Sequence, residues 1–217
     1  MKKILSGCFL TLALSGIGLS PVEAHPHVFV EANIEVVRDD KGRFVELRHV
    51  WRFDELFSAT TVLDFDADGD GVLGPDELAL LSSNVKESIS EFDFFTALRV
   101  AGKAVEFYEP EELKSYYEND QLIMLMAIEV AEPYDFSGGP LRVSVSDTSF
   151  YVAFDYDVKN ISVEGPSDTC ASSVVHPDFD KLYASDSLSL TEAFFDDPTN
   201  TQNLGDEFYS WATIDCK

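Results

Sequence analysis

The sequence predicts an α+β protein: an antiparallel, sandwich-like β-rich domain with an inserted helix-loop-helix and an irregular C-terminal segment. Two observations lead to this prediction. In many stretches apolar and polar residues alternate, which is the period of a half-buried strand. Between two groups of such stretches, residues 53–92 change to the three- and four-residue spacing of amphipathic helices, and an aspartate-rich loop separates the two helical parts.

Residues 1–24 have the three parts of a secretory signal peptide. Positive charge at Lys2 and Lys3 is followed by an apolar run to Leu19 and by small residues up to Ala24. We therefore expect export and cleavage after Ala24, which would make His25 the first residue of the mature chain. No later stretch reaches the roughly 18 apolar residues that a membrane-spanning helix needs, so we expect no such helix.

The chain is strongly acidic. It contains 40 Asp and Glu residues against 15 Lys and Arg residues, a formal net charge of −25. Nucleic acids and anionic lipids are bound through clusters of Lys and Arg that neutralise phosphate, so this composition argues against both as partners. It favours cations and basic partners, or it serves only to keep the protein soluble.

Alternating stretches predict the strands of a β-rich domain over residues 25–164. Residues 28–36 and 45–53 are joined by the turn sequence Asp39-Asp40-Lys41-Gly42, which predicts a hairpin. Further strands are predicted at residues 95–100, 105–108, 122–130, 141–145 and 150–156. Because residues 122–130 are almost all apolar, we expect that strand to be buried on both faces.

The two helices of the insert are predicted from the spacing of their apolar residues. Side chains three or four positions apart lie on one side of a helix, and the apolar side is expected to face the core. On the first helix these residues are Phe53, Leu56, Phe57, Thr60 and Leu63. On the second helix they are Leu78, Leu81, Val85, Ile89 and Phe92.

Residues 66–77 match every position of the 12-residue calcium loop of an EF-hand. The insert is therefore predicted to be an EF-hand. The ligands would be three aspartates, one backbone carbonyl and both oxygens of the last residue: Asp66, Asp68, Asp70, Val72 and Glu77. Gly71 permits the sharp turn, and Leu73 is expected to anchor the loop in the core. The alternative is a metal-free, aspartate-rich turn. A lone site of this kind in an exported protein suggests weak affinity and a structural role.

The segment from residue 165 to residue 217 is polar and rich in turns, and we expect it to pack on the same domain. Short helices are predicted at residues 178–184 and 190–195, and a closing segment at 208–214. Cys170 and Cys216 are the cysteines that remain after the leader is removed. Two thiols in an exported chain usually pair, so we predict a Cys170–Cys216 disulfide; two separate buried thiols are the alternative.

Two of the four histidines, His25 and His27, lie at the predicted new N-terminus. With the α-amine they would offer three nitrogen ligands for copper, nickel or zinc, and the alternative is an ordinary solvated terminus. His49 lies on the apolar face of its strand and is expected in the core, whereas His176 could complete a metal site. The sequence contains no nucleophile elbow, phosphate-binding glycine loop, CxxC or HExxH motif, so we expect no enzyme. A copper oxygenase built on the two N-terminal histidines is the enzymatic alternative.

Several stretches resemble the periplasmic proteins of the family called domain of unknown function 1007, which are grouped with uncharacterised periplasmic components of ABC-type transport systems. The similar stretches are residues 24–30, 51–58, 66–77, 91–95, 150–154 and 211–216. The resemblance implies a periplasmic protein often encoded beside NicO-type nickel or cobalt permeases, with some members tied to zinc use. No ligand set is established for the family.

The sequence and the resemblance together predict a non-enzymatic periplasmic protein that binds calcium and assists transition-metal homeostasis. Zinc, nickel or cobalt would bind at His25 and His27, and a membrane metal permease would be the partner. The alternative is a calcium-stabilised protein-interaction module with no transition-metal site.

Overall fold

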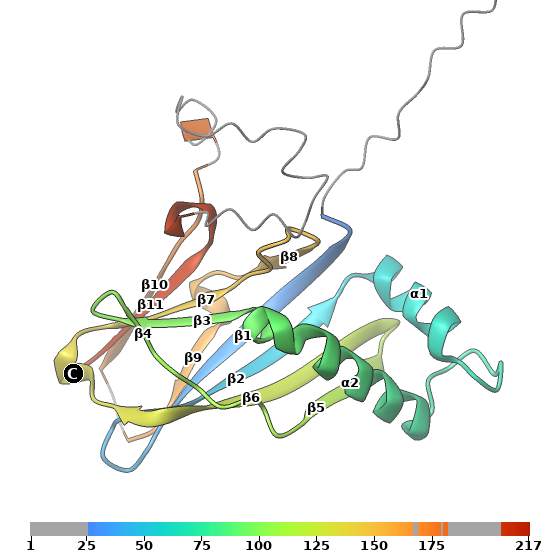
Figure 1. Ribbon diagram of the computed structural model, residues 1–217, viewed down its shortest axis with the longest axis horizontal. Helices are drawn as coiled ribbons and strands as arrows, with labels where there is room; N and C mark the ends of the chain where they lie inside the picture. The colour runs from blue at the N-terminus through green and yellow to red at the C-terminus, as the bar shows by residue number, and fades with distance from the viewer. Residues whose placement is uncertain (1–25, 167–168, 179, 182–204) are drawn as a thin grey trace, which may run out of the picture.

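Two β-sheets and a pair of helices form the part of the chain that the computed structural model describes, which is residues 26–166, 169–178, 180–181 and 205–217 (Figure 1). The predicted leader, His25 and the helix predicted at 190–195 lie outside these residues, as does most of the helix predicted at 178–184.

The predicted hairpin is the centre of the first sheet, sheet A. Strands β1 (Val28–Arg38) and β2 (Phe44–Phe53) pair antiparallel, with Ile34 opposite His49. The turn between them closes where the Gly42 backbone N–H donates to the Asp39 carbonyl, and the positive φ of Gly42 (78°) suits glycine. Sheet A continues from β2 through two further strands, β6 (Gln121–Tyr134) and β5 (Leu113–Glu118).

The other edge of sheet A departs from the predicted antiparallel pattern. Strands β8 (Val152–Asp155) and β9 (Ile161–Glu164) both pair parallel with β1, β8 along its first half and β9 along its second half. The prediction of an entirely antiparallel sheet is therefore wrong at this edge. Strand direction depends on where the connecting chain crosses the molecule, and alternation of residues within a strand does not encode that path.

The second sheet, sheet B, is antiparallel and has the order β10-β11-β7-β3-β4. Its strands are β3 (Thr96–Val100), β4 (Lys103–Ala104), β7 (Leu141–Val145), β10 (Cys170–Val175) and β11 (Trp211–Cys216). The strand predicted at 105–108 is absent from this sheet, because Phe107 instead forms an isolated bridge with Val130 of β6.

The hydrophobic core lies between the inner faces of the two sheets. Alternate residues of β1 are buried, from Val28 to Val36, as the sequence pattern predicted. Trp51 of β2 connects the sheets, since its ring lies 6.1 Å from the ring of Phe95, which precedes β3, and 5.1 Å from that of Phe154 on β8. Burial on both faces was predicted for residues 122–130 and is wrong for the second half of β6, where Ala127 and Glu129 are exposed.

Helices α1 (Glu55–Phe65) and α2 (Pro75–Ile89) lie together beside the β5 and β6 end of sheet A (Figure 1). The predicted inner side of α2 is confirmed for Leu81 and Ile89, which are buried, but it is wrong for Phe92, which lies beyond the end of the helix and is 40% exposed. A polar contact also joins α2 to the sheet: the Ser82 hydroxyl lies 2.9 Å from the Ser115 hydroxyl and accepts from the Ser115 backbone N–H at 2.9 Å. After α2 the short 3-10 helix η1 (Ser90–Phe95) leads into β3.

The predicted inner side of α1 is correct for Phe57, whose ring stacks on that of Phe53 and packs against the core, but wrong for the two leucines. Leu56 and Leu63 are 75% and 81% exposed, whereas Ser58 and Thr61 are buried. The Ser58 hydroxyl donates to the Asp54 carbonyl and accepts from the Leu122 backbone N–H at 2.9 Å, so a hydrogen bond joins this helix to β6 in addition to its apolar contacts with the core. Apolar spacing alone does not reveal such a polar contact.

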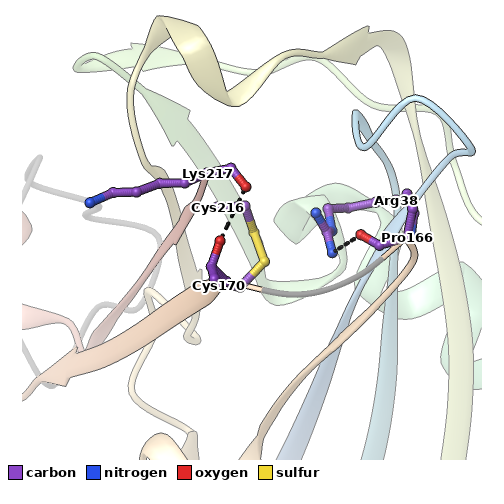
Figure 2. Close-up of a disulfide and its surroundings, with 6 residues drawn as sticks. Arg38, Pro166, Cys170, Cys216 and Lys217 are labelled. Carbon is purple, nitrogen blue, oxygen red and sulfur yellow. Dashed lines mark hydrogen bonds between the residues drawn. A yellow bond between two sulfur atoms is a disulfide. The ribbon is translucent and has the colours of Figure 1, made fainter.

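The predicted disulfide is confirmed. Cys170 on β10 and Cys216 on β11 are directly opposite in the sheet register, and their sulfur atoms are 2.05 Å apart (Figure 2). The Thr169 hydroxyl donates to the Lys217 carbonyl beside the bridge. The disulfide therefore ties the last strand of the chain to its neighbour in sheet B.

We predict that replacing both cysteines, Cys170→Ser with Cys216→Ser, lowers the free energy of unfolding by about 2–4 kcal/mol, because the bridge closes a long loop in the unfolded chain. The loop spans a sequence separation of 46. Denaturant unfolding of the oxidised protein and of the double variant measures the difference. Equal unfolding midpoints at equal slope would contradict the prediction.

Candidate metal centre

The aspartate-rich loop is held between two helix ends. Asp66 is the C-cap residue of α1, and its backbone N–H donates to the Val62 carbonyl at 2.9 Å. Gly74 is the N-cap residue of α2, which starts at Pro75. Between these ends the carboxylate oxygens of three residues, Asp66, Asp68 and Asp70, lie within 4.8 Å of one another. The structure therefore brings together the three aspartates that the sequence pattern singled out.

Backbone N–H groups turn the aspartates inward. The Asp66 carboxylate accepts from Gly71 at 2.8 Å, from Gly69 at 2.8 Å and from Asp70 at 3.2 Å. These hydrogen bonds, led by that of Gly71, hold the pKa of Asp66 below its ordinary value because they stabilise the charged form. The φ angles of Gly69 (75°) and Gly71 (85°) are positive, so glycine suits both positions.

Glu77 joins the two ends of the loop. One of its carboxylate oxygens accepts from the Ala67 backbone N–H at 2.7 Å, and the other accepts from Gly74 at 2.7 Å. Both oxygens are thus bonded to the backbone, and Glu77 is outside the group formed by the three aspartates. Because Ala67 follows Asp66 in the chain, this hydrogen bond nevertheless holds the Glu77 carboxylate beside the start of the loop.

The eighth and seventh positions of the loop differ in their surroundings. Leu73 is buried and belongs to the hydrophobic core, as predicted, so the loop is attached to the rest of the protein by an apolar contact. Val72 is exposed, and its backbone N–H donates to the Asp70 carboxylate at 2.9 Å. The sequence pattern identifies each loop position, but these backbone hydrogen bonds have no separate sequence signal.

The donor set of this loop fits a hard cation. All of its side-chain donors are carboxylate oxygens, which suit Ca²⁺ or Mg²⁺, whereas zinc and nickel sites usually include nitrogen or sulfur. Asp68 and Asp70 are exposed, so an ion could reach them from solvent. Within the described part of the chain this is the one group of three acidic, His or Cys side chains close enough to share a metal ion.

The N-terminal histidine pair is only half described. His25 lies outside the described residues, so the prediction that it acts with His27 stays a prediction. His27 is exposed immediately before β1; its backbone N–H donates to the Tyr151 carbonyl at 2.9 Å, and its ring lies 5.0 Å from the Tyr151 ring. His176 is also exposed, with Nδ1 3.0 Å from the Ser210 hydroxyl.

His49 lies in the core, as predicted. It is 1% exposed, and its Nε2 lies 3.2 Å from the Thr96 hydroxyl, which links β2 to β3 of the other sheet. Its Nδ1 has no hydrogen-bond partner within the described residues. His49 projects to the inner face of sheet A, so it does not join the exposed His27 in one site.

These features define a β-rich protein of two sheets with a helix-loop-helix that carries an oxygen-lined candidate cation site. The chain matches, over residues 10–216, the family described as "Protein of unknown function (DUF1007)", and it belongs to that family. A comparison with curated proteins found no match. Within the described residues, no helix has both the length and the apolar character needed to cross a membrane.

We predict that His49 makes the protein sensitive to acid. Burial lowers the pKa of His49 from 6.5 to about 3, so below pH 6.5 the unfolded state binds a proton that the folded state excludes. Stability is therefore lost as the pH falls from about 6.5 towards 3. Between pH 7 and pH 4 this histidine should account for a loss of about 3 kcal/mol.

The test compares the free energy of unfolding of the wild type and of His49→Gln at pH 7 and pH 4. Glutamine keeps a polar group facing Thr96 but does not titrate in this range. The variant is expected to be less stable at pH 7 and to lose less on acidification. An equal loss in both proteins would show that other groups cause the pH dependence.

Proposed function

We propose that the protein is an exported calcium-binding protein whose EF-hand, residues 66–77, holds one Ca²⁺ ion in a structural role. The observation that carries the proposal is the convergence of the Asp66, Asp68 and Asp70 carboxylates within 4.8 Å of one another. The fit of the 12-residue pattern adds to it, because the same three positions supply the first ligands of an EF-hand loop.

Electrostatics favour a cation in this loop. Three carboxylates at such short range repel one another, and backbone N–H groups offset that repulsion only in part. A divalent ion with six to eight oxygen ligands would offset most of it. The carbonyl of Val72 and the carboxylate of Glu77 are the remaining protein ligands that the pattern assigns, and Ca²⁺ would supply the positive charge that the loop lacks.

A structural role follows from the position of the loop. Leu73 attaches the loop to the hydrophobic core, and the loop's two ends are the end of α1 and the start of α2. Helix α1 leaves Leu56 and Leu63 exposed and packs on the core through half-buried side chains, which are Phe57, Val62 and Phe65. An ion bound between the helices would therefore fix α1 relative to α2 and, through Leu73, stabilise the folded protein.

We predict that millimolar Ca²⁺ raises the melting temperature by roughly 5–10 °C, which corresponds to an ion at about 100 times its dissociation constant. The shift should be lost in Asp70→Asn and in Glu77→Gln, because each substitution removes the negative charge of one proposed calcium ligand. Differential scanning calorimetry with calcium and with a chelator measures it.

The matched control for this experiment is Asp76→Asn. Asp76 is exposed, lies beside Glu77 in the first turn of α2, and occupies a loop position that supplies no ligand. This variant removes the same charge and should keep the calcium-dependent shift. The calcium proposal fails if the wild type shows no shift, or if Asp76→Asn loses the shift as completely as Asp70→Asn.

We further propose a periplasmic, non-enzymatic role in which His25 and His27 take part in handling zinc, nickel or cobalt for a membrane metal permease. Membership of the DUF1007 family supports this role only through the association that the resemblance implied. The exposure of His27 is the structural observation in its favour, because a ligand near the chain start must be reachable by the ion.

We predict that protein exported with its own signal contains about one equivalent of transition metal, and that His25→Ala with His27→Ala loses it. Elemental analysis after purification without chelators measures the metal. His176→Ala is the control, since it removes an exposed histidine elsewhere. Equal metal in the wild type and the double variant would leave the alternative, a calcium-stabilised interaction module without a transition-metal site.

A further inference from the structure

The outer face of sheet A, opposite the core, carries a groove of about 740 Å³. Its floor consists of outward-facing residues of β1, β2 and β6, which are neighbouring strands. At the β6 edge the chain runs from Tyr108 to Glu112 between the Phe107 bridge and β5, and this segment forms a wall of the groove. At the β9 edge the groove reaches Ser162.

The groove is negatively charged. Its lining contains Arg48 and Lys114 and six glutamates, which are Glu35, Glu46, Glu109, Glu111, Glu112 and Glu129. These glutamates come from three strands and from the connection before β5, so they are scattered over almost a hundred positions of the sequence. The carboxylates of the lining outnumber its basic side chains, and this excess of negative charge becomes visible only in the fold.

Arg48 shows how a guanidinium is held in this groove. Its side chain bonds Glu46 at 2.5 Å, Glu35 at 3.0 Å and Glu164, on β9, at 2.7 Å. Lys114 pairs with Glu112. By contrast, the described part of the chain offers no ion pair to the carboxylates of Glu111 and Glu129, which are exposed on the wall and the floor.

Apolar surface lies among these charges. Val50, Leu125 and Ala127 line the floor, and Tyr108, which is 59% exposed, lines the wall. The opposite face of the same strands packs in the hydrophobic core, whereas on this face Arg48, Ala127 and Glu129 are exposed. The groove therefore offers apolar contact and negative charge together.

We propose that this groove docks an extended segment of a partner protein that presents both basic and apolar side chains to it. Charge complementarity selects basic side chains, and the apolar floor selects a polypeptide over a bare ion. A single metal ion does not fit, because no three acidic side chains of the groove lie close enough together to share one. From β1 to β6 the floor spans two strand spacings of about 4.8 Å, so about three extended residues cross it.

The experiment uses a short, fluorescently labelled peptide that repeats two lysines followed by two valines, so that each face of the extended chain carries both residue types. Its binding is measured by fluorescence anisotropy with calcium in all samples. The same peptide with glutamate in place of lysine is the counter-probe. We expect the lysine peptide to bind and the glutamate peptide not to bind. Glu111→Gln with Glu129→Gln should weaken binding about three- to tenfold, the range of two exposed ion pairs. Tyr108→Ser should weaken it without a change of charge.

Glu87→Gln with Glu91→Gln is the matched control. Both residues are exposed on or just after α2, outside the groove, and the net charge changes by the same amount. Affinity unchanged in this control supports the groove. Equal weakening in both double variants, no binding of the lysine peptide, or equal binding of both peptides would overturn the proposal. Sedimentation tests whether a second copy of the chain covers the groove. A dimeric wild type together with a monomeric groove variant would also overturn the proposal.

Discussion

The pairing of β1 and β2 is the constraint on which the rest of the structure depends. Side chains of a strand point alternately to its two faces, so one register decides which residues of both strands enter the core and which face outward. With Ile34 opposite His49, the inner face receives His49 and Trp51, and the outer face receives Glu35 and Arg48. A shift of one residue would exchange the two sets.

The helix-loop-helix attaches to this sheet by few but specific contacts. Ser58 bonds the backbone of Leu122, Ser82 bonds Ser115, and Leu73 reaches the core. These hydroxyl hydrogen bonds add to the apolar packing of both helices against the core. The loop itself gathers three carboxylates that repel one another, and this repulsion is the physical reason for proposing a cation there.

Negative charge occurs in the protein in two different arrangements. In the loop, three aspartates within a span of five residues surround one centre, which suits a single ion. On the outer face of sheet A, the glutamates are spread around apolar side chains, which suits an extended partner. The composition alone, with its net charge of −25, does not distinguish these arrangements.

The sequence by itself determined the features that depend on short-range spacing: the hairpin, the glycine turns and aspartates of residues 66–77, the inner side of α2, and the identity of the two cysteines in the disulfide. Tertiary structure alone decided the parallel pairing of β8 and β9 with β1, the outward position of Leu56 and Leu63, and the acidic groove. These features arise where segments far apart in the chain meet. Local periodicity states which side of a segment is apolar, but the path of the chain decides which neighbour covers that side.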